Sequence, residues 1–377
     1  RPGRRRRRTS TLLAAVAALS LVAAACGGDD DEAGSDDGTT TSQPAGSSTT
    51  TSEAPLEKTT LTVIGVPQAN VLPIFAAIEE GFFADRGLTV EFRPSASSRD
   101  FVPALLGGSA DIAVPSISIA LNASASGAPV KVIGTSGHAT ELRMAVDADK
   151  AAELGIEPGD PADEQLAKLK GSGLRIGVTA PGGGVHAQTS GILEARDIST
   201  SGDVELVPFD GGDAMLAGLE GDVVDAFVWN PPQTLALGDD VVLIEYRELE
   251  EYEGIDFIVL LAAAKGLEDN PATFQAFADG WVEGWQFVQD NPDEALEILR
   301  TVVSPGLDDA LTEKLLESAT VNFGPTPALT ETGVSKGLAL TNLGAPQQVD
   351  VSFADLVDNS FVNEAIENLD LDVPAGD

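Results

Sequence analysis

The residues that decide the fold are 61–92, which read LTVIGVPQANVLPIFAAIEEGFFADRGLTVEF. The first six form an apolar run typical of a buried strand, and residues 88–92 form a second one. Between them, Ile74, Phe75, Ile78 and Phe82 have the spacing of one face of a helix. A strand, a helix and a strand in this order predict two parallel strands joined by a right-handed crossover.

The same alternation continues along the chain. In the first half we expect helices at 98–106 and 116–126, and strands at 111–114 and 130–134. In the second half we expect strands at 174–179, 204–207, 224–228 and 241–244, and helices at 185–195 and 214–219. Two segments correspond, LLGGSADIA at 105–113 and LEGDVVDAF at 219–227, although any turn between a helix and a strand has similar features. The sequence therefore predicts an α/β protein with two doubly wound lobes.

Two apolar stretches, 143–146 and 257–263, lie at the borders of the second half. We interpret them as the crossings of a two-segment hinge. Lobe I then comprises 59–146 plus 255–377, and lobe II comprises 147–254. A chain of 377 residues suits two lobes. The segment from Pro271 is predicted to be a helix that packs on lobe I, because its apolar side chains share one face: Phe274, Phe277, Ala278, Trp281, Trp285 and Val288.

The N-terminal region has the features of an export signal. Residues 4–8 are all arginine, residues 11–25 are short and apolar, and small residues precede Cys26, the only cysteine. The segment VAAAC at 22–26 resembles a bacterial lipobox, except that Ala23 occupies the position where leucine is usual. We expect residues 1–25 to be the signal peptide and Cys26 to be lipidated. The alternative for Cys26 is a leftover thiol after an ordinary signal peptide.

Residues 26–58 are predicted to be a flexible tether. They consist mainly of Asp, Gly, Ser and Thr, which bury too little apolar surface to fold. A flexible chain of this length has a reach of about 30 Å. The expected location is the extracytoplasmic face of the cell membrane, with the lipid as the only membrane contact.

The net charge of −38 excludes several classes of function. Such a surface repels nucleic acid and anionic lipid headgroups. One cysteine and two histidines are too few for a zinc site, and neither a G-x-S-x-G nor an H-E-x-x-H motif is present. We therefore expect no metal, no cofactor and no catalysis.

Several segments resemble the binding-protein family for nitrate, sulfonates, taurine and thiamine precursors, a branch of the type II periplasmic binding proteins. They are 73–83, 87–91, 105–113, 219–232, Asn270–Pro271 and 291–295, and together they span most of residues 60–300. The resemblance implies two α/β lobes that close on a small ligand. It also implies delivery of that ligand to an ABC permease with a cytoplasmic ATPase, and we expect a monomer.

The ligand is expected at the carboxyl ends of the strands, where loops lead into helix N-termini. In lobe I this rule selects Gln68, Asn70, Ser97, Ser98, Arg99, Ser116, Ser136 and His138. In lobe II it selects Thr179, Gly183, Gly184, His186, Asp210, Trp229 and Asn230. The serines also suit helix capping, Arg99 and His186 suit a solvated surface, and Trp229 suits a core.

The ligand's charge stays open at this stage. Arg99 and the helix N-termini favour a small sulfonate or carboxylate, whereas Trp229 and Asp210 suit a heteroaromatic or amine-bearing vitamin precursor. Two other functions remain as alternatives. Residues 182–187 fit the G-x-G-x-x-A pattern of an NAD-type enzyme, with Asp210 as the ribose-binding acid. A signalling or adhesion lipoprotein with the same fold is the other.

Overall fold

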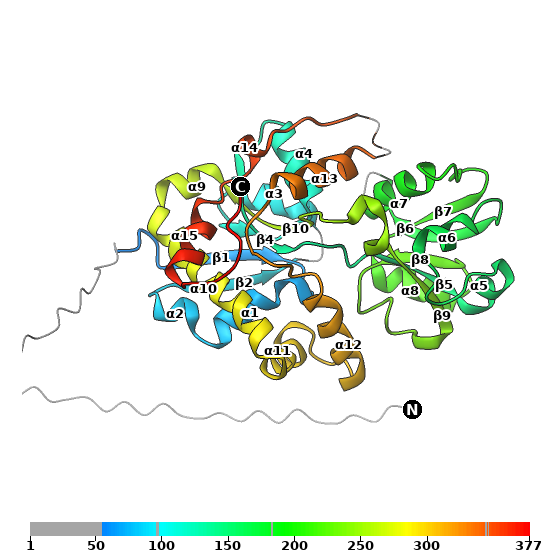
Figure 1. Ribbon diagram of the computed structural model, residues 1–377, viewed down its shortest axis with the longest axis horizontal. Coiled ribbons are helices and arrows are strands. Elements are labelled where there is room, and N and C mark those ends of the chain that lie inside the picture. Colours follow the sequence, from blue (N-terminus) through cyan, green and yellow to red (C-terminus); the bar gives the residue numbers. More distant parts are fainter. Residues whose placement is uncertain (1–54, 96–97, 182–183, 344, 346) are drawn as a thin grey trace, which may run out of the picture. The chain divides into compact units, whose positions relative to one another are not determined.

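The structure is a computed structural model, and it describes residues 55–95, 98–181, 184–343, 345 and 347–377. These residues form two five-stranded sheets, both visible in Figure 1. Sheet A has the order β2-β1-β3-β10-β4, and sheet B has the order β7-β6-β8-β5-β9. The prediction of an α/β protein with two wound sheets is confirmed.

Sheet A contains β1 (Thr60–Gly65), β2 (Thr89–Pro94), β3 (Ile112–Ala113), β4 (Val130–Gly137) and β10 (Ile258–Ala263). The first part of the chain adds η1 (Ala69–Val71), α1 (Leu72–Glu79), α2 (Phe82–Asp85), η2 (Ser98–Asp100), α3 (Phe101–Leu106) and α4 (Ile117–Ala125). The helix expected from the apolar face at Ile74–Phe82 is divided into α1 and α2 because Gly81 adopts a left-handed conformation, with φ of 84°.

Sheet B contains β5 (Arg143–Asp147), β6 (Leu174–Thr179), β7 (Val204–Phe209), β8 (Ala226–Trp229) and β9 (Val241–Glu245). The helices in this part are α5 (Ala148–Leu154), α6 (Ala162–Ala167), α7 (Gly184–Glu194), α8 (Gly212–Glu220), η3 (Gly238–Asp240), η4 (Tyr246–Glu248) and η5 (Glu250–Tyr252). The sequence pattern predicted neither α5 nor α6.

Neither sheet is wholly parallel, which the strand–helix alternation did not predict. β10 runs antiparallel to β3 and β4, and β5 runs antiparallel to β8 and β9. The stretches 143–146 and 257–263, expected as hinge crossings, therefore form most of the inner strands β5 and β10. Their apolar composition reflects burial within a sheet. The chain passes between the sheets in residues 138–142, the first crossing, and in residues 246–257, the second crossing.

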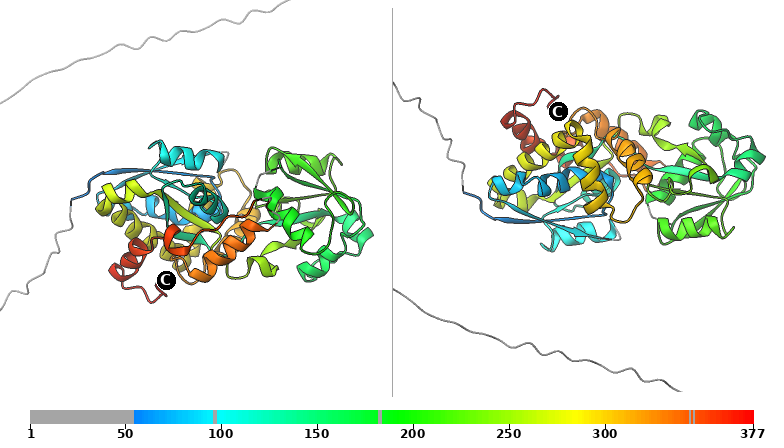
Figure 2. Two further views of the ribbon diagram at one scale, coloured as in Figure 1. Left: turned by 90° about the horizontal axis from the view of Figure 1, so that it is seen from above. Right: turned by 90° about the horizontal axis from the view of Figure 1, so that it is seen from below.

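The C-terminal part is helical and begins with α9 (Ala264–Asp269) and α10 (Pro271–Asp290). The remaining elements are α11 (Pro292–Ile298), the π-helix η6 (Leu299–Val303), α12 (Asp309–Thr320), α13 (Glu331–Asn342), α14 (Phe353–Leu356) and α15 (Ser360–Asn368). Helix α10 packs on α1 and α15, and the yellow-to-red helices lie around sheet A in both views of Figure 2. The predicted apolar face of α10 is confirmed, since all six of its side chains are buried. Burial of each large one stabilises the fold by about 1.5–3 kcal/mol.

The two corresponding sequence segments perform the same structural task. Asp111, just before β3, accepts a hydrogen bond from the backbone N–H of Thr62 in β1 at 2.8 Å. Asp225, just before β8, accepts one from the backbone N–H of Arg175 in β6 at 2.9 Å. Each aspartate thus ties the start of one strand to its neighbour.

A single hydrophobic cluster joins residues of both sheets through the second crossing, where Tyr246, Leu249, Tyr252, Ile255 and Phe257 are all buried. The rings of Tyr252 and Phe257 meet edge to face, with centroids 5.9 Å apart. The second crossing is therefore part of the core. Among the described residues, no helix has the length and apolar character needed to cross a membrane.

Candidate functional site

The carboxyl edge of sheet A presents two of the predicted site residues as buried groups without partners. Asn70 lies in η1, directly after β1, and its Oδ1 atom is buried with no hydrogen-bond partner. Ser136 lies near the end of β4, is 1% exposed, and its Oγ atom also lacks a partner. A buried polar atom without a partner costs about 1–3 kcal/mol. Two such atoms at one edge indicate a place where a bound molecule would complete the hydrogen bonds.

Other predicted residues of lobe I lie nearby in the chain but have different surroundings. Gln68 is half-buried and precedes η1 as its N-cap residue. Ser116 is the N-cap residue of α4, and its backbone bridges to Ile258 at the start of β10. Ser98 and Arg99 lie in η2, where Arg99 is exposed. Ser97 lies outside the described residues.

The carboxyl edge of sheet B holds the predicted residues of lobe II. Thr179 ends β6, and its Oγ1 accepts a hydrogen bond from the backbone N–H of His186 at 3.1 Å. Thr179 therefore fixes the first turn of α7, which begins at Gly184. Asp210 follows β7 and is exposed. Gly183, like Cys26, lies outside the described residues.

The loop after β8 contains a second group of buried polar atoms without partners. Asn230 Oδ1 and Thr234 Oγ1 both lack partners, and Thr234 is fully buried. Gln233 Oε1 is also unpartnered, while its Nε2 donates to Asp213 Oδ1 at 2.8 Å and so ties the loop to the start of α8. Like the carboxyl edge of sheet A, this loop contains buried side-chain oxygens that could accept further hydrogen bonds.

Trp229, Arg143 and Glu245 form a row on one face of sheet B. Arg143 lies opposite Trp229 in β8 and opposite Glu245 in β9. Directly opposed residues of antiparallel strands project from the same face. The Trp229 indole packs against the backbone of Gly212, where a Cβ atom would lie 2.3 Å from the indole nitrogen. Trp229 is half-buried, so it combines a packing role with an accessible surface.

Arg143 is a candidate site residue that the strand-end rule did not select. It is 2% exposed; its Nε donates to Glu245 Oε2 at 3.1 Å and its Nη2 donates to Ser318 Oγ in α12 at 2.9 Å. Its Nη1 is buried and has no partner. An arginine as the first residue of an otherwise apolar strand was the available signal, and the segment 143–146 was interpreted only for its apolar residues.

Glu141 and Asn322 form a further buried group beside Arg143. Glu141 Oε1 and both side-chain polar atoms of Asn322 lack partners. Burial raises the pKa of Glu141 from its ordinary value of 4.5 to about 7. The charges of Arg143 and Arg247 and the neighbouring Asn322 amide lower this pKa, but their effect is smaller than that of burial. Glu141 is therefore a carboxyl group that titrates near neutral pH.

His138 has a structural partner on each side of its ring. Nδ1 lies 2.7 Å from Asp256 Oδ1, and Nε2 contacts the carbonyl oxygen of Thr326. Burial opposes protonation of the imidazole, but the hydrogen bond and the charge of Asp256 outweigh it and raise the pKa of His138. Both ring nitrogens are thus occupied, and the pair ties the first crossing to the second.

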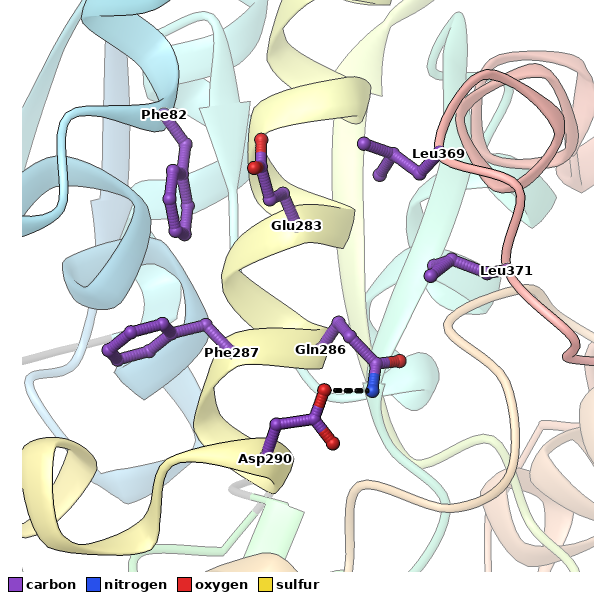
Figure 3. Close-up of a pocket in the computed structure, with 7 residues that line it drawn as sticks. All are labelled: Phe82, Glu283, Gln286, Phe287, Asp290, Leu369 and Leu371. Carbon is purple, nitrogen blue, oxygen red and sulfur yellow. Dashed lines mark hydrogen bonds between the residues drawn. The ribbon is translucent and has the colours of Figure 1, made fainter.

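Two cavities lie in the described part of sheet A and its helices. One, of about 460 Å³, lies at the carboxyl end of β2 and is lined by residues that include Arg93, Ser95 and Asp100. The other, of about 270 Å³, is drawn in Figure 3, where Phe82 and Phe287 lie on one side of α10 and Leu369 and Leu371 on the other. Only the first lies at a strand end of the kind that the sequence selected.

The fold is that of the periplasmic binding proteins. The family described as NMT1/THI5 like matches residues 68–295, and the chain belongs to this family. No curated protein matches the chain.

Solved structures extend the likeness over both sheets. A protein of Bordetella bronchiseptica RB50 is 24% identical, with a TM-score of 0.68 over 84% of this chain and 100% of that one. The nitrate-binding protein NrtA from Synechocystis PCC 6803 is 17% identical, with a TM-score of 0.62 over 85% and 91% of the two chains. The alkanesulfonate-binding protein SsuA from Xanthomonas axonopodis pv. citri is 18% identical, with a TM-score of 0.61 over 80% and 99%. At these identities the likeness establishes the fold.

Proposed function

We propose that this protein is the extracytoplasmic solute-binding component of an ABC importer. It captures a small organic ligand by closure of two lobes and delivers it to a membrane permease that works with a cytoplasmic ATPase. It acts as a monomer and performs no chemistry on the ligand. Cys26 carries the lipid that anchors it to the cell membrane, and residues 26–58 form the tether.

The observation that carries this proposal is the distribution of buried polar atoms without partners. Asn70 and Ser136 lie at the carboxyl edge of sheet A, and Arg143, Asn230 and Thr234 lie at the corresponding edge of sheet B. In open α/β sheets, ligands bind at this edge. A ligand that contacts both edges binds the closed form more tightly than the open form, and this difference shifts the equilibrium between them.

The membership of the NMT1/THI5-like family and the fold shared with proteins named for binding nitrate and alkanesulfonate support a transport role. The proposed ligand is a sulfonate- or carboxylate-type anion or a vitamin precursor. Arg143 favours the anion, because its Nη1 is a buried cationic donor that an acidic group would satisfy. The lobes expected from the sequence comprise 59–146 plus 255–377 and 147–254. Because β5 is a strand of sheet B, the boundaries proposed here lie in the two crossings, 138–142 and 246–257, and the lobes move about them.

The test is thermal unfolding of the purified protein with sulfonates, carboxylates, amines, nitrate, vitamin precursors and NAD. A ligand at 100 times its dissociation constant adds about 2.7 kcal/mol to the free energy of unfolding. We expect one chemical class to raise the melting temperature, and Ser136→Ala and Asn230→Ala to reduce that rise. Asn122→Ala is the matched control, since Asn122 is exposed on α4. The proposal would be refuted if NAD alone raised the melting temperature, or if none of the compounds did.

A further inference from the structure

Charged and polar side chains from four segments meet where the first crossing enters sheet B. We call this group the hinge junction, and it consists of Glu141, Arg143, Glu245, Arg247 and Asn322. Glu141 lies in the first crossing, Arg143 begins β5, Glu245 and Arg247 belong to β9 and η4, and Asn322 follows α12. The junction therefore links both crossings to the helical part of the chain.

Within the junction, both arginines are engaged with the same carboxylate. Arg143 Nε lies 3.1 Å and Arg247 Nε 3.6 Å from Glu245 Oε2. Arg143 is held further by Ser318 in α12. Among the described residues, Glu141 forms no ion pair and its Oε1 has no hydrogen bond, although it is only 9% exposed. Glu141 is the junction's unpaired acid.

The two protonation states of an unpaired, buried carboxyl group favour different surroundings. When protonated, it can remain buried at the modest cost of a neutral polar group. When ionised, it needs water or a cation. Arg143 and Arg247 are both engaged with Glu245 through their Nε atoms, and the unpartnered Nη1 of Arg143 forms no ion pair with Glu141 in the described structure. Water reaches Glu141 most simply if the first crossing separates from Asn322 and the end of α12.

We propose that ionisation of Glu141 opens the hinge junction, so that the arrangement of the two sheets depends on pH. Protonated Glu141 favours the joined arrangement described above, and ionised Glu141 favours a separated arrangement in which its carboxylate is hydrated. The proposal concerns the conformational equilibrium of the chain alone. It does not require that the proposed transport function is correct.

The other charged groups around Glu141 do not reverse the expected opening at higher pH. Glu245 is held by two arginines, so it does not recruit a cation for Glu141. The His138–Asp256 pair, in the same two crossings, is strongest when the imidazole is protonated. Loss of that proton at higher pH weakens the contact between the crossings and therefore acts in the same direction as Glu141.

The size of the effect follows from the two states of the carboxyl group. Its pKa is about 7 when buried, and the ordinary value of 4.5 applies when it is hydrated. The equilibrium between the separated and joined arrangements should then change about 30-fold between pH 5.5 and pH 8.0 through Glu141 alone, by proton linkage.

The test is a distance measurement between the two sheets by double electron–electron resonance. Spin labels are placed on Glu80→Cys and Lys168→Cys, two exposed positions beyond α1 and α6, in a Cys26→Ser background. We expect the distance distribution to shift toward a separated population as the pH rises from 5.5 to 8.0. Glu141→Gln, which cannot ionise, should show only the smaller response that His138 contributes.

The control variant is Glu317→Gln, which removes the same charge from an exposed position on α12 and should respond as the unmodified protein does. A distribution that is the same at both pH values would overturn the proposal. So would a Glu141→Gln response equal to that of the control. Circular dichroism of each variant at both pH values confirms that the chain remains folded, so that a shift reports movement and not unfolding.

Discussion

The replacement of Gly284 by alanine tests the packing that positions the loop after β1. Gly284 lies in α10, and a Cβ atom there would lie 2.3 Å from the carbonyl oxygen of Pro73 and 2.9 Å from the Cβ of Ala77. Both contacts belong to α1, the helix that follows Asn70. A backbone oxygen cannot rotate away, so α1 must move as a unit. We expect Gly284→Ala to lower the free energy of unfolding by about 1–3 kcal/mol through overpacking.

Gly266→Ala in α9 is the matched control. There the nearest atoms to an added Cβ are ring carbons of Phe274 at 3.7 Å, an ordinary contact distance. Both substitutions gain up to about 1 kcal/mol from the higher helix propensity of alanine, so Gly266→Ala should stabilise the chain slightly. Urea unfolding followed by circular dichroism measures both variants. If Gly284→Ala proved as stable as Gly266→Ala, the inference that α1 and α10 are too closely packed at Gly284 to admit a Cβ atom would be refuted.

Two further predictions concern the buried ion pairs. Asp256→Asn should lower the free energy of unfolding most at acidic pH. The raised pKa of His138 contributes stability that is fully present below the pKa of His138 in the unfolded chain and is lost as the pH rises through its pKa in the folded chain. Unfolding titrations at pH 5.5 and 8.5 measure this, and a loss of stability that is larger at pH 8.5 would contradict it. Arg143→Met should cost about 3 kcal/mol by leaving Glu245 partly uncompensated. Lys265→Met removes the exposed ion pair with Asp269 and should lower the free energy of unfolding by less than about 0.5 kcal/mol. Urea unfolding of both variants measures this, and equal losses of stability in Arg143→Met and Lys265→Met would argue against a buried pair at Arg143.

Most strands could be predicted because their apolar runs are short and bounded by turn residues. The run at 174–179 matches β6, and the stripe from Pro271 matches α10. The apolar runs of β5 and β10 could be located in the sequence, but their composition did not show that they are antiparallel strands and not hinge crossings. An apolar run has the same composition in a buried strand and in a buried crossing, and only the pairing with β8 or with β4 distinguishes them.

The candidate site could be predicted in part for a similar reason. The rule that ligands bind at strand ends selected Asn70, Ser136 and Asn230, each of which has a buried side-chain oxygen without a partner. It did not find Glu141 or Arg143, because both belong to the entry of an antiparallel strand, and the rule considers only the exits of parallel ones. The partners of His138 lie far away in sequence, so no local pattern could show that both its ring nitrogens are engaged.

The place of β10 in sheet A affects when this protein can fold. β4 pairs within the sheet only with β10, and β10 begins roughly 120 residues after β4 ends. Sheet A therefore stays incomplete until more than two thirds of the chain has been synthesised. Pairings over such long separations form slowly, because a long loop must close before the contacts stabilise it. A chain built in this way emerges from the ribosome before its first sheet can be completed.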